Sequence, residues 1–112
     1  SVWPKHAESK IYSLLKDSIY NKRPQFRKSK AVAVLAMARL FPSAFLEIVT
    51  DIVDPMSMNV WECRYAGWMM LDEISKDQLI GSRWIDNLDA DVRNDPDRFV
   101  MSRAQLLIES LH

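Results

Sequence analysis

The sequence predicts an all-α domain, and three observations support this fold class. The chain has 112 residues, 48% of them hydrophobic, which suffices for one core but not for two ordinary domains. It contains only 2 glycines and 5 prolines, which leaves little material for the tight turns of a β-sheet protein. Apolar residues recur at helical spacing, and no segment is typical of a strand. We therefore expect about six helices in antiparallel pairs, forming a short helical stack or an irregular bundle.

Three helices are expected in the first half of the chain. Apolar residues at helical spacing predict the first over about residues 8–21. The second should begin with Ser29 as its cap, and its run over residues 31–38 is apolar nearly all round, which indicates burial on several sides. A third, amphipathic helix should lie between the helix breakers at Pro42 and Asp54.

Three more helices are expected in the second half. The pattern Asn59-x-x-Glu62 has the form of a capping box and should open the fourth. The same form at residues 75–78 should open the fifth. Asp95 is followed by a proline at the first helical position, which is a strong start signal for the last helix.

The expected helix starts near residues 29, 60 and 96 are 31 and 36 residues apart, which is the spacing of helical solenoids. The segment 60–74 resembles a HEAT-repeat helix, with Arg64, then an alanine, then a Leu-x-x-Ile ending. Residues 95–111 resemble the same unit, and residues 30–40 are a weaker copy. This resemblance covers about residues 29–111 and implies a scaffold or adaptor surface. Not every helix-breaking proline of that family is present, so an irregular helical bundle is the alternative.

The charge distribution is uneven although the net charge is zero. Residues 1–40 carry nine Lys and Arg against two acidic residues, whereas residues 41–112 carry six against thirteen. This asymmetry favours association with a charged partner, or self-association between the basic N-terminal part of one chain and the acidic C-terminal part of another. A single cysteine excludes an internal disulfide and favours the cytoplasm or the nucleus.

No apolar run is long enough to cross a membrane, so we expect no membrane association. The chain opens without an initiator Met, with an apolar Val-Trp. We expect residues 1–112 to be a single domain that was cut from a larger protein.

Aromatic residues suggest a binding surface. On the fourth helix, Cys63 falls on the expected core face, which predicts a buried and inert thiol. An opposite stripe is rich in aromatic side chains, and either neighbouring helices or a protein partner would cover it. The candidate partner-binding residues on this stripe and on the fifth helix are Trp61, Tyr65, Trp68 and Trp84.

A basic segment suggests a second kind of partner. Five cations stand within nine residues without an acidic residue: Lys22, Arg23, Arg27, Lys28 and Lys30. Such a segment could bind nucleic acid through its phosphates, or an acidic protein. A solvated loop is the commoner explanation of such a pattern.

The sequence contains no recognised catalytic arrangement. It has no Ser-His-Asp set, no glycine-rich phosphate loop and no metal-ligand spacing, and its acidic run over residues 89–97 lacks the ligands of a calcium-binding loop. We therefore predict a protein-protein interaction domain that binds a partner peptide or subunit, is not an enzyme, and needs no cofactor or metal. Nucleic-acid binding and self-association are the alternatives.

Overall fold

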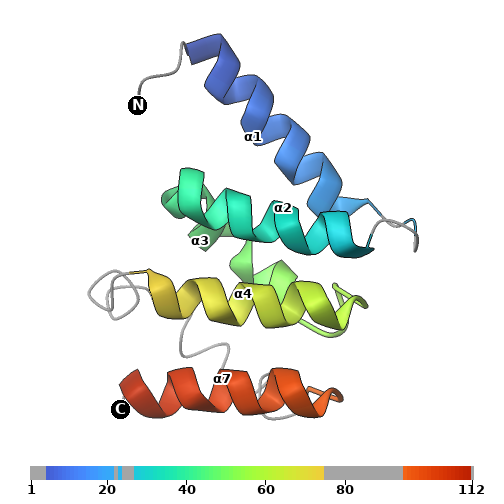
Figure 1. Ribbon diagram of the computed structural model, residues 1–112, viewed down its shortest axis with the longest axis vertical. Helices are drawn as coiled ribbons and strands as arrows, with labels where there is room; N and C mark the ends of the chain where they lie inside the picture. Colours follow the sequence, from blue (N-terminus) through green and yellow to red (C-terminus); the bar gives the residue numbers. More distant parts are fainter. Residues whose placement is uncertain (1–4, 22, 24–26, 75–94, 112) are drawn as a thin grey trace.

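A computed structural model of the protein describes residues 5–21, 23, 27–74 and 95–111. These residues form five α-helices and no strand, so the all-α prediction is confirmed (Figure 1). The helices are α1 Lys5–Tyr20, α2 Arg27–Leu40, α3 Pro42–Val53, α4 Trp61–Glu73 and α7 Arg98–Leu111. The expected fifth helix, which begins at residue 75, lies outside the described residues.

Helices α2, α4 and α7 lie side by side in this order and run in the same direction (Figure 1). Arg27 at the start of α2 lies 3.6 Å from Glu62 at the start of α4, and Arg39 lies 3.5 Å from Glu73 where both helices end. Between α2 and α4 the chain returns through α3, which packs on both. Parallel stacking of alternate helices is the arrangement that a solenoid needs, and the HEAT-like assignment itself stays a prediction.

The core is shared by all five helices, since α1 packs on α2, the helices α2, α3 and α4 pack on one another, and α7 packs on α4. Helix α2 thus packs on α1, α3 and α4 and needs an apolar surface on more than one side, which explains its long apolar run. The largest side chains that are fully buried are those of Trp68, Phe45, Ile19, Met37, Ile52, Met70 and Leu71.

Two expected helix caps are wrong because the helices begin elsewhere. Helix α2 begins at Arg27, so Ser29 lies inside its first turn. Helix α4 begins at Trp61, with Val60 as its cap and no side-chain hydrogen bond, so Asn59 does not cap it. Val60 is buried, which indicates that packing sets this boundary.

The start of α7 also differs from the expectation. Asp97 caps the helix, because its Oδ1 accepts hydrogen bonds from the backbone N–H groups of Phe99 and Val100 at 2.9 and 3.0 Å. Asp95, the expected cap, instead binds the side chain of Arg64. Because Asp95 is engaged by Arg64, the helix is capped two residues later, by Asp97.

Gly67 of α4 lies in close contact with α3. A Cβ atom at this position would lie 2.9 Å from Cγ2 of Ile52 and 3.0 Å from Cγ1 of Val53. Both neighbours are branched side chains in the core, with little freedom to move. The absence of a side chain at Gly67 thus sets the distance between the two helices.

We expect Gly67→Ala to lower the free energy of unfolding by up to about 2 kcal/mol, measured by urea denaturation. Overpacking a core costs about 1–3 kcal/mol, while alanine in a helix regains about 1 kcal/mol relative to glycine. In an Ile52→Ala background the loss from Gly67→Ala should be smaller, because the closest methyl group is gone. A Gly67→Ala protein more stable than the wild type would contradict the close approach of α3 and α4.

Candidate binding surface

An aromatic cluster spans the adjoining faces of α4 and α7. The rings of Trp61 and Tyr65 meet edge to face with centroids 6.5 Å apart, and the rings of Trp61 and Phe99 lie 6.3 Å apart. Trp61 is 38% exposed and Phe99 is 68% exposed, while Tyr65 is half-buried. We call Trp61, Tyr65 and Phe99 the aromatic surface. It unites two predicted binding residues with Phe99, which sequence reasoning missed.

The prediction that Trp68 contacts a partner is wrong for this fold. Its side chain is only 2% exposed and belongs to the core. Trp68 lies in the middle of α4, where neighbouring elements enclose it, whereas Trp61 lies at the open first turn of the same helix. The aromatic stripe is therefore partly core and partly surface. Trp84, the fourth predicted residue, lies outside the described residues.

The basic residues of the predicted nucleic-acid or acidic-partner contact also differ in their exposure. Lys30 is only 4% exposed, so the prediction that it lies on the surface is wrong, and it helps to line a cavity. Arg27 forms an ion pair with Glu62. Arg23 and Lys28 are exposed, and Lys22 lies outside the described residues. Position on the inner side of α2, rather than charge, decides the surroundings of Lys30.

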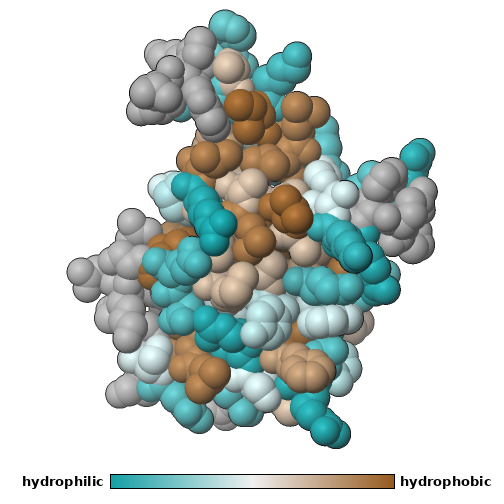
Figure 2. Space-filling model, in the orientation of Figure 1, coloured by the Kyte–Doolittle hydropathy of each residue, from teal (hydrophilic) through white to brown (hydrophobic). Residues whose placement is uncertain are grey.

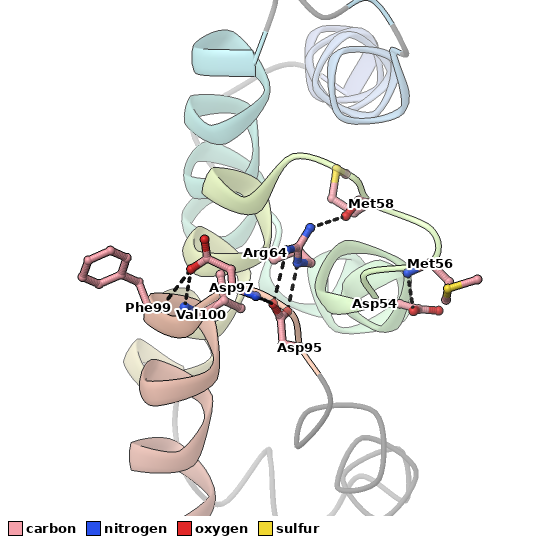
Figure 3. Close-up of polar contacts among 8 residues, drawn as sticks. All are labelled: Asp54, Met56, Met58, Arg64, Asp95, Asp97, Phe99 and Val100. Carbon is pink, nitrogen blue, oxygen red and sulfur yellow. Dashed lines mark hydrogen bonds and ion pairs between the residues drawn. The ribbon is translucent and has the colours of Figure 1, made fainter.

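A buried ion pair holds α7 against α4. Nε of Arg64 donates to Oδ2 of Asp95 at 2.9 Å, and Nη2 donates to Oδ1 at 3.2 Å (Figure 3). Nη1 donates to the backbone carbonyl of Met58 at 2.7 Å, and Oδ1 of Asp95 accepts from the N–H of Asp97. Two-pronged pairing between a guanidinium and a carboxylate fixes geometry as well as charge. We call Arg64 and Asp95 the clamp; it ties together α4, the loop before it and the start of α7.

A second polar contact joins α7 to α4 near the end of α4. Asp72 accepts a hydrogen bond from Arg103 of α7 at 2.6 Å. Residue pairs 64–95 and 72–103 therefore tie α7 and the residues before it to α4 at two points. In this arrangement Phe99 lies beside Trp61.

Apolar side chains also gather elsewhere on the molecule. Figure 2 shows them over α1 and α2, whereas the surface over α4 and α7 mixes polar and apolar groups. Leu14 of α1, 60% exposed, is among the large exposed apolar residues. It provides a control for the aromatic surface, because it is a similarly exposed apolar residue on a different helix.

Cys63 is fully buried, as predicted. Burial raises the pKa of its thiol to about 11, and the nearby ammonium of Lys30 lowers it only in part. A thiol with this pKa is protonated at neutral pH, which makes it a poor nucleophile. Cys63 is therefore a core residue in this structure.

Metal ligands do not cluster in the described part of the chain: no group of three or more His, Cys, Asp or Glu side chains there could hold an ion. The expected absence of a metal or cofactor stays a prediction. Among the helices of the described ranges, none combines the length and apolar character needed to cross a membrane.

Two known proteins are similar in sequence to this chain. The chain is 34% identical over 113 residues to the bilin biosynthesis protein CpeY of Synechococcus sp. (strain WH8020), a match that covers 98% of the chain and 26% of that protein. It is 35% identical over 72 residues to the uncharacterized phycocyanin operon protein Y of Pseudanabaena tenuis (strain PCC 7409), covering 63% of the chain and 16% of that protein. No family model matches the chain, and no solved structure does either.

The chain thus spans about a quarter of the length of the first relative and about a sixth of the second. The first similarity contradicts the prediction that the chain is not an enzyme, since nearly the whole chain matches a protein of a biosynthetic process. The prediction relied on the lack of a recognised catalytic motif.

Proposed function

We propose that this chain is part of an enzyme of bilin biosynthesis, and that its aromatic surface binds a protein on which that enzyme acts. The observation that supports the first part is the 34% identity to a bilin biosynthesis protein over 98% of the chain. The name of the second relative refers to the phycocyanin operon, which makes a phycocyanin subunit the first partner to test. Both relatives come from cyanobacteria, which supports the cytoplasm over the nucleus.

The physical character of the aromatic surface supports the second part. Tryptophan and tyrosine combine a large apolar area with a polar edge, and they dominate the energetics of protein interfaces. The clamp and the Asp72–Arg103 contact fix α7 against α4, so the rings of Trp61 and Phe99 are held together before any partner arrives. A surface ordered in advance loses less entropy on binding. A HEAT-like stack would supply such a surface along its length.

The structure gives nucleic-acid binding less support than the sequence alone did. Lys30 is buried and Arg27 is paired with Glu62, so neither of these two proposed cations is a free charge on the surface. Neither relative has a name that refers to nucleic acid. Self-association through opposite charges stays a prediction; light scattering would refute it if the mass remained monomeric at low salt.

The enzyme proposal can be tested with the natural protein that carries this chain, incubated with a bilin and phycocyanin subunits that lack their bilin. We expect the protein to accelerate a change in the visible absorption spectrum of the bilin that requires the subunit. The rate at low subunit concentration should fall at least tenfold in a Trp61→Ala, Phe99→Ala variant and should be unchanged in Leu14→Ala. No acceleration by the wild-type protein would refute the enzyme proposal. Normal rates in the double variant would refute the role of the aromatic surface.

A further inference from the structure

A second feature, separate from the aromatic surface, is a cavity of about 260 Å³. It lies where the end of α1, the start of α2, the end of α3 and the following loop meet. Its buried apolar wall is formed by Ile19, Ile52 and Met58. Polar side chains complete the lining and include those of Lys30 and Asp51.

Lys30 is the unusual member of this lining. Burying an ammonium group is costly unless an anion or hydrogen-bond acceptors compensate for the lost water. Yet Lys30 is 4% exposed, and the ion pairs within the described ranges do not include it. Asp51 lines the same cavity, but the ion pairs of the described residues do not join it to Lys30. The cavity is therefore the place where Lys30 can meet an anion.

The carboxylate of Asp51 is already engaged by another group. The hydroxyl of Tyr20 donates a hydrogen bond to Oδ2 of Asp51 at 3.0 Å. Burial, and then this hydrogen bond and the charge of Asp51, raise the pKa of Tyr20 to about 12, so its proton stays in place at neutral pH. This contact occupies one oxygen of Asp51, whose carboxylate keeps its charge, while Lys30 supplies a positive charge to the same lining.

The loop side of the cavity is held in place by Asp54. Oδ1 of Asp54 accepts a hydrogen bond from the N–H of Met56 at 2.8 Å, and Oδ2 accepts one from the hydroxyl of Ser57 at 3.3 Å (Figure 3 shows the first). The backbone N–H of Met58 bonds to the carbonyl of Asp54 at 2.8 Å. These bonds form a compact turn after α3, so this wall is built before a ligand enters.

We propose that this cavity binds a small organic carboxylate, whose charged group pairs with Lys30 and whose carbon atoms contact Ile19, Ile52 and Met58. Its volume lies just below the range of about 300–1,000 Å³ that is usual for small-molecule sites. The cavity therefore suits a short carboxylic acid, or one carboxylate arm of a larger molecule. The proposal does not rest on the proposed enzyme function.

The test is an NMR titration of the protein with propionate, following the side-chain methyl signals of Ile19, Ile52 and Met58. We expect saturable shifts of these signals with propionate and none with propionamide, which has the same shape without the charge. Equal binding of propionamide would overturn the role of charge. No saturable shift with propionate would overturn the site itself.

Variants separate a cavity site from loose ion binding. Lys30→Met should weaken propionate binding at least tenfold, while Lys28→Met, which removes an exposed cation from the same helix, should leave it unchanged. Because Lys30→Met could impair folding, Asn59→Asp provides a second variant: it adds a second negative charge, besides that of Asp51, at an exposed position of the lining and should also weaken binding at least tenfold. An equal effect of Lys28→Met, or none of Asn59→Asp in a folded protein, would overturn the proposal.

The source of the carboxylate is settled by competition. Biliverdin is a bilin with propionate arms, and displacement of propionate by biliverdin would assign the site to an arm of a larger molecule. Failure to displace it would assign the site to a free short acid. Both results support a carboxylate site, and neither depends on whether the protein changes a bilin chemically.

Discussion

Asp95→Ala should lower the free energy of unfolding by about 3–5 kcal/mol, measured by urea denaturation. The reason is that the substitution leaves the guanidinium of Arg64 buried without its carboxylate. Arg64 and Asp95 are both almost fully buried, and two hydrogen bonds join them. The N–H of Asp97 would lose its acceptor as well. We therefore expect the docking of α7 on α4 to be weakened more by this change than by the loss of any exposed ion pair.

Two comparisons make this prediction specific to a buried charge. The double variant Arg64→Met, Asp95→Leu should lose less stability than Asp95→Ala alone, because no charge is left unpaired in the core. Glu73→Ala removes the partner of Arg39, in an exposed pair between α2 and α4, and should cost no more than about 1 kcal/mol. Equal losses for Asp95→Ala and Glu73→Ala would show that the clamp contributes no more than a surface contact.

Trp68→Ala should also cost about 3–5 kcal/mol, because it removes a large side chain from the core and leaves a cavity. Trp61→Ala, two turns earlier on the same helix, should cost less than about 1 kcal/mol, since its ring is already partly in water. Circular dichroism during urea denaturation measures both without relying on tryptophan emission.

This pair of variants is matched in residue type and in helix. If Trp61→Ala and Trp68→Ala destabilised the protein equally, the assignment of one ring to the surface and the other to the core would be wrong. If the predicted difference is found, Trp61 can be changed in binding experiments without loss of the fold. Trp68 cannot be used in that way, because a loss of binding would also report unfolding.

Local signals in the sequence were enough to predict the fold class and several helix boundaries. Proline at position 42 separates α2 from α3, and the pair Asp54-Pro55 follows the last residue of α3. Both act through the backbone of a few residues. The caps at Asn59 and Asp95 were wrong because tertiary contacts decided them. Val60 is buried at the start of α4, and Arg64 binds Asp95.

The candidate sites were predicted less well, for a physical reason. Helical periodicity places Trp61 and Trp68 on one stripe, but it cannot tell which part of the stripe another element covers. The same limit applies to Lys30, whose charge suggested a surface position. Phe99 was missed because its place beside Trp61 depends on how α7 packs against α4, which the clamp and the Asp72–Arg103 contact hold in place.

The enzyme prediction failed for a different reason. It rested on the absence of known catalytic patterns from the 112 residues, and such an absence does not exclude a part in catalysis. The similarity to a bilin biosynthesis protein supplied information that periodicity, capping and charge do not contain. Local patterns in the sequence predicted the helical architecture, but they did not predict the chemistry.

Binding of a phycocyanin subunit to the natural protein that carries this chain, measured by surface plasmon resonance, tests the proposed aromatic surface most directly. The account predicts that the double variant Trp61→Ala, Phe99→Ala binds at least tenfold more weakly than the wild type, a loss of at least about 1.4 kcal/mol. Leu14→Ala should bind as the wild type does. An unchanged affinity in a double variant that keeps its helical circular dichroism spectrum would contradict the account.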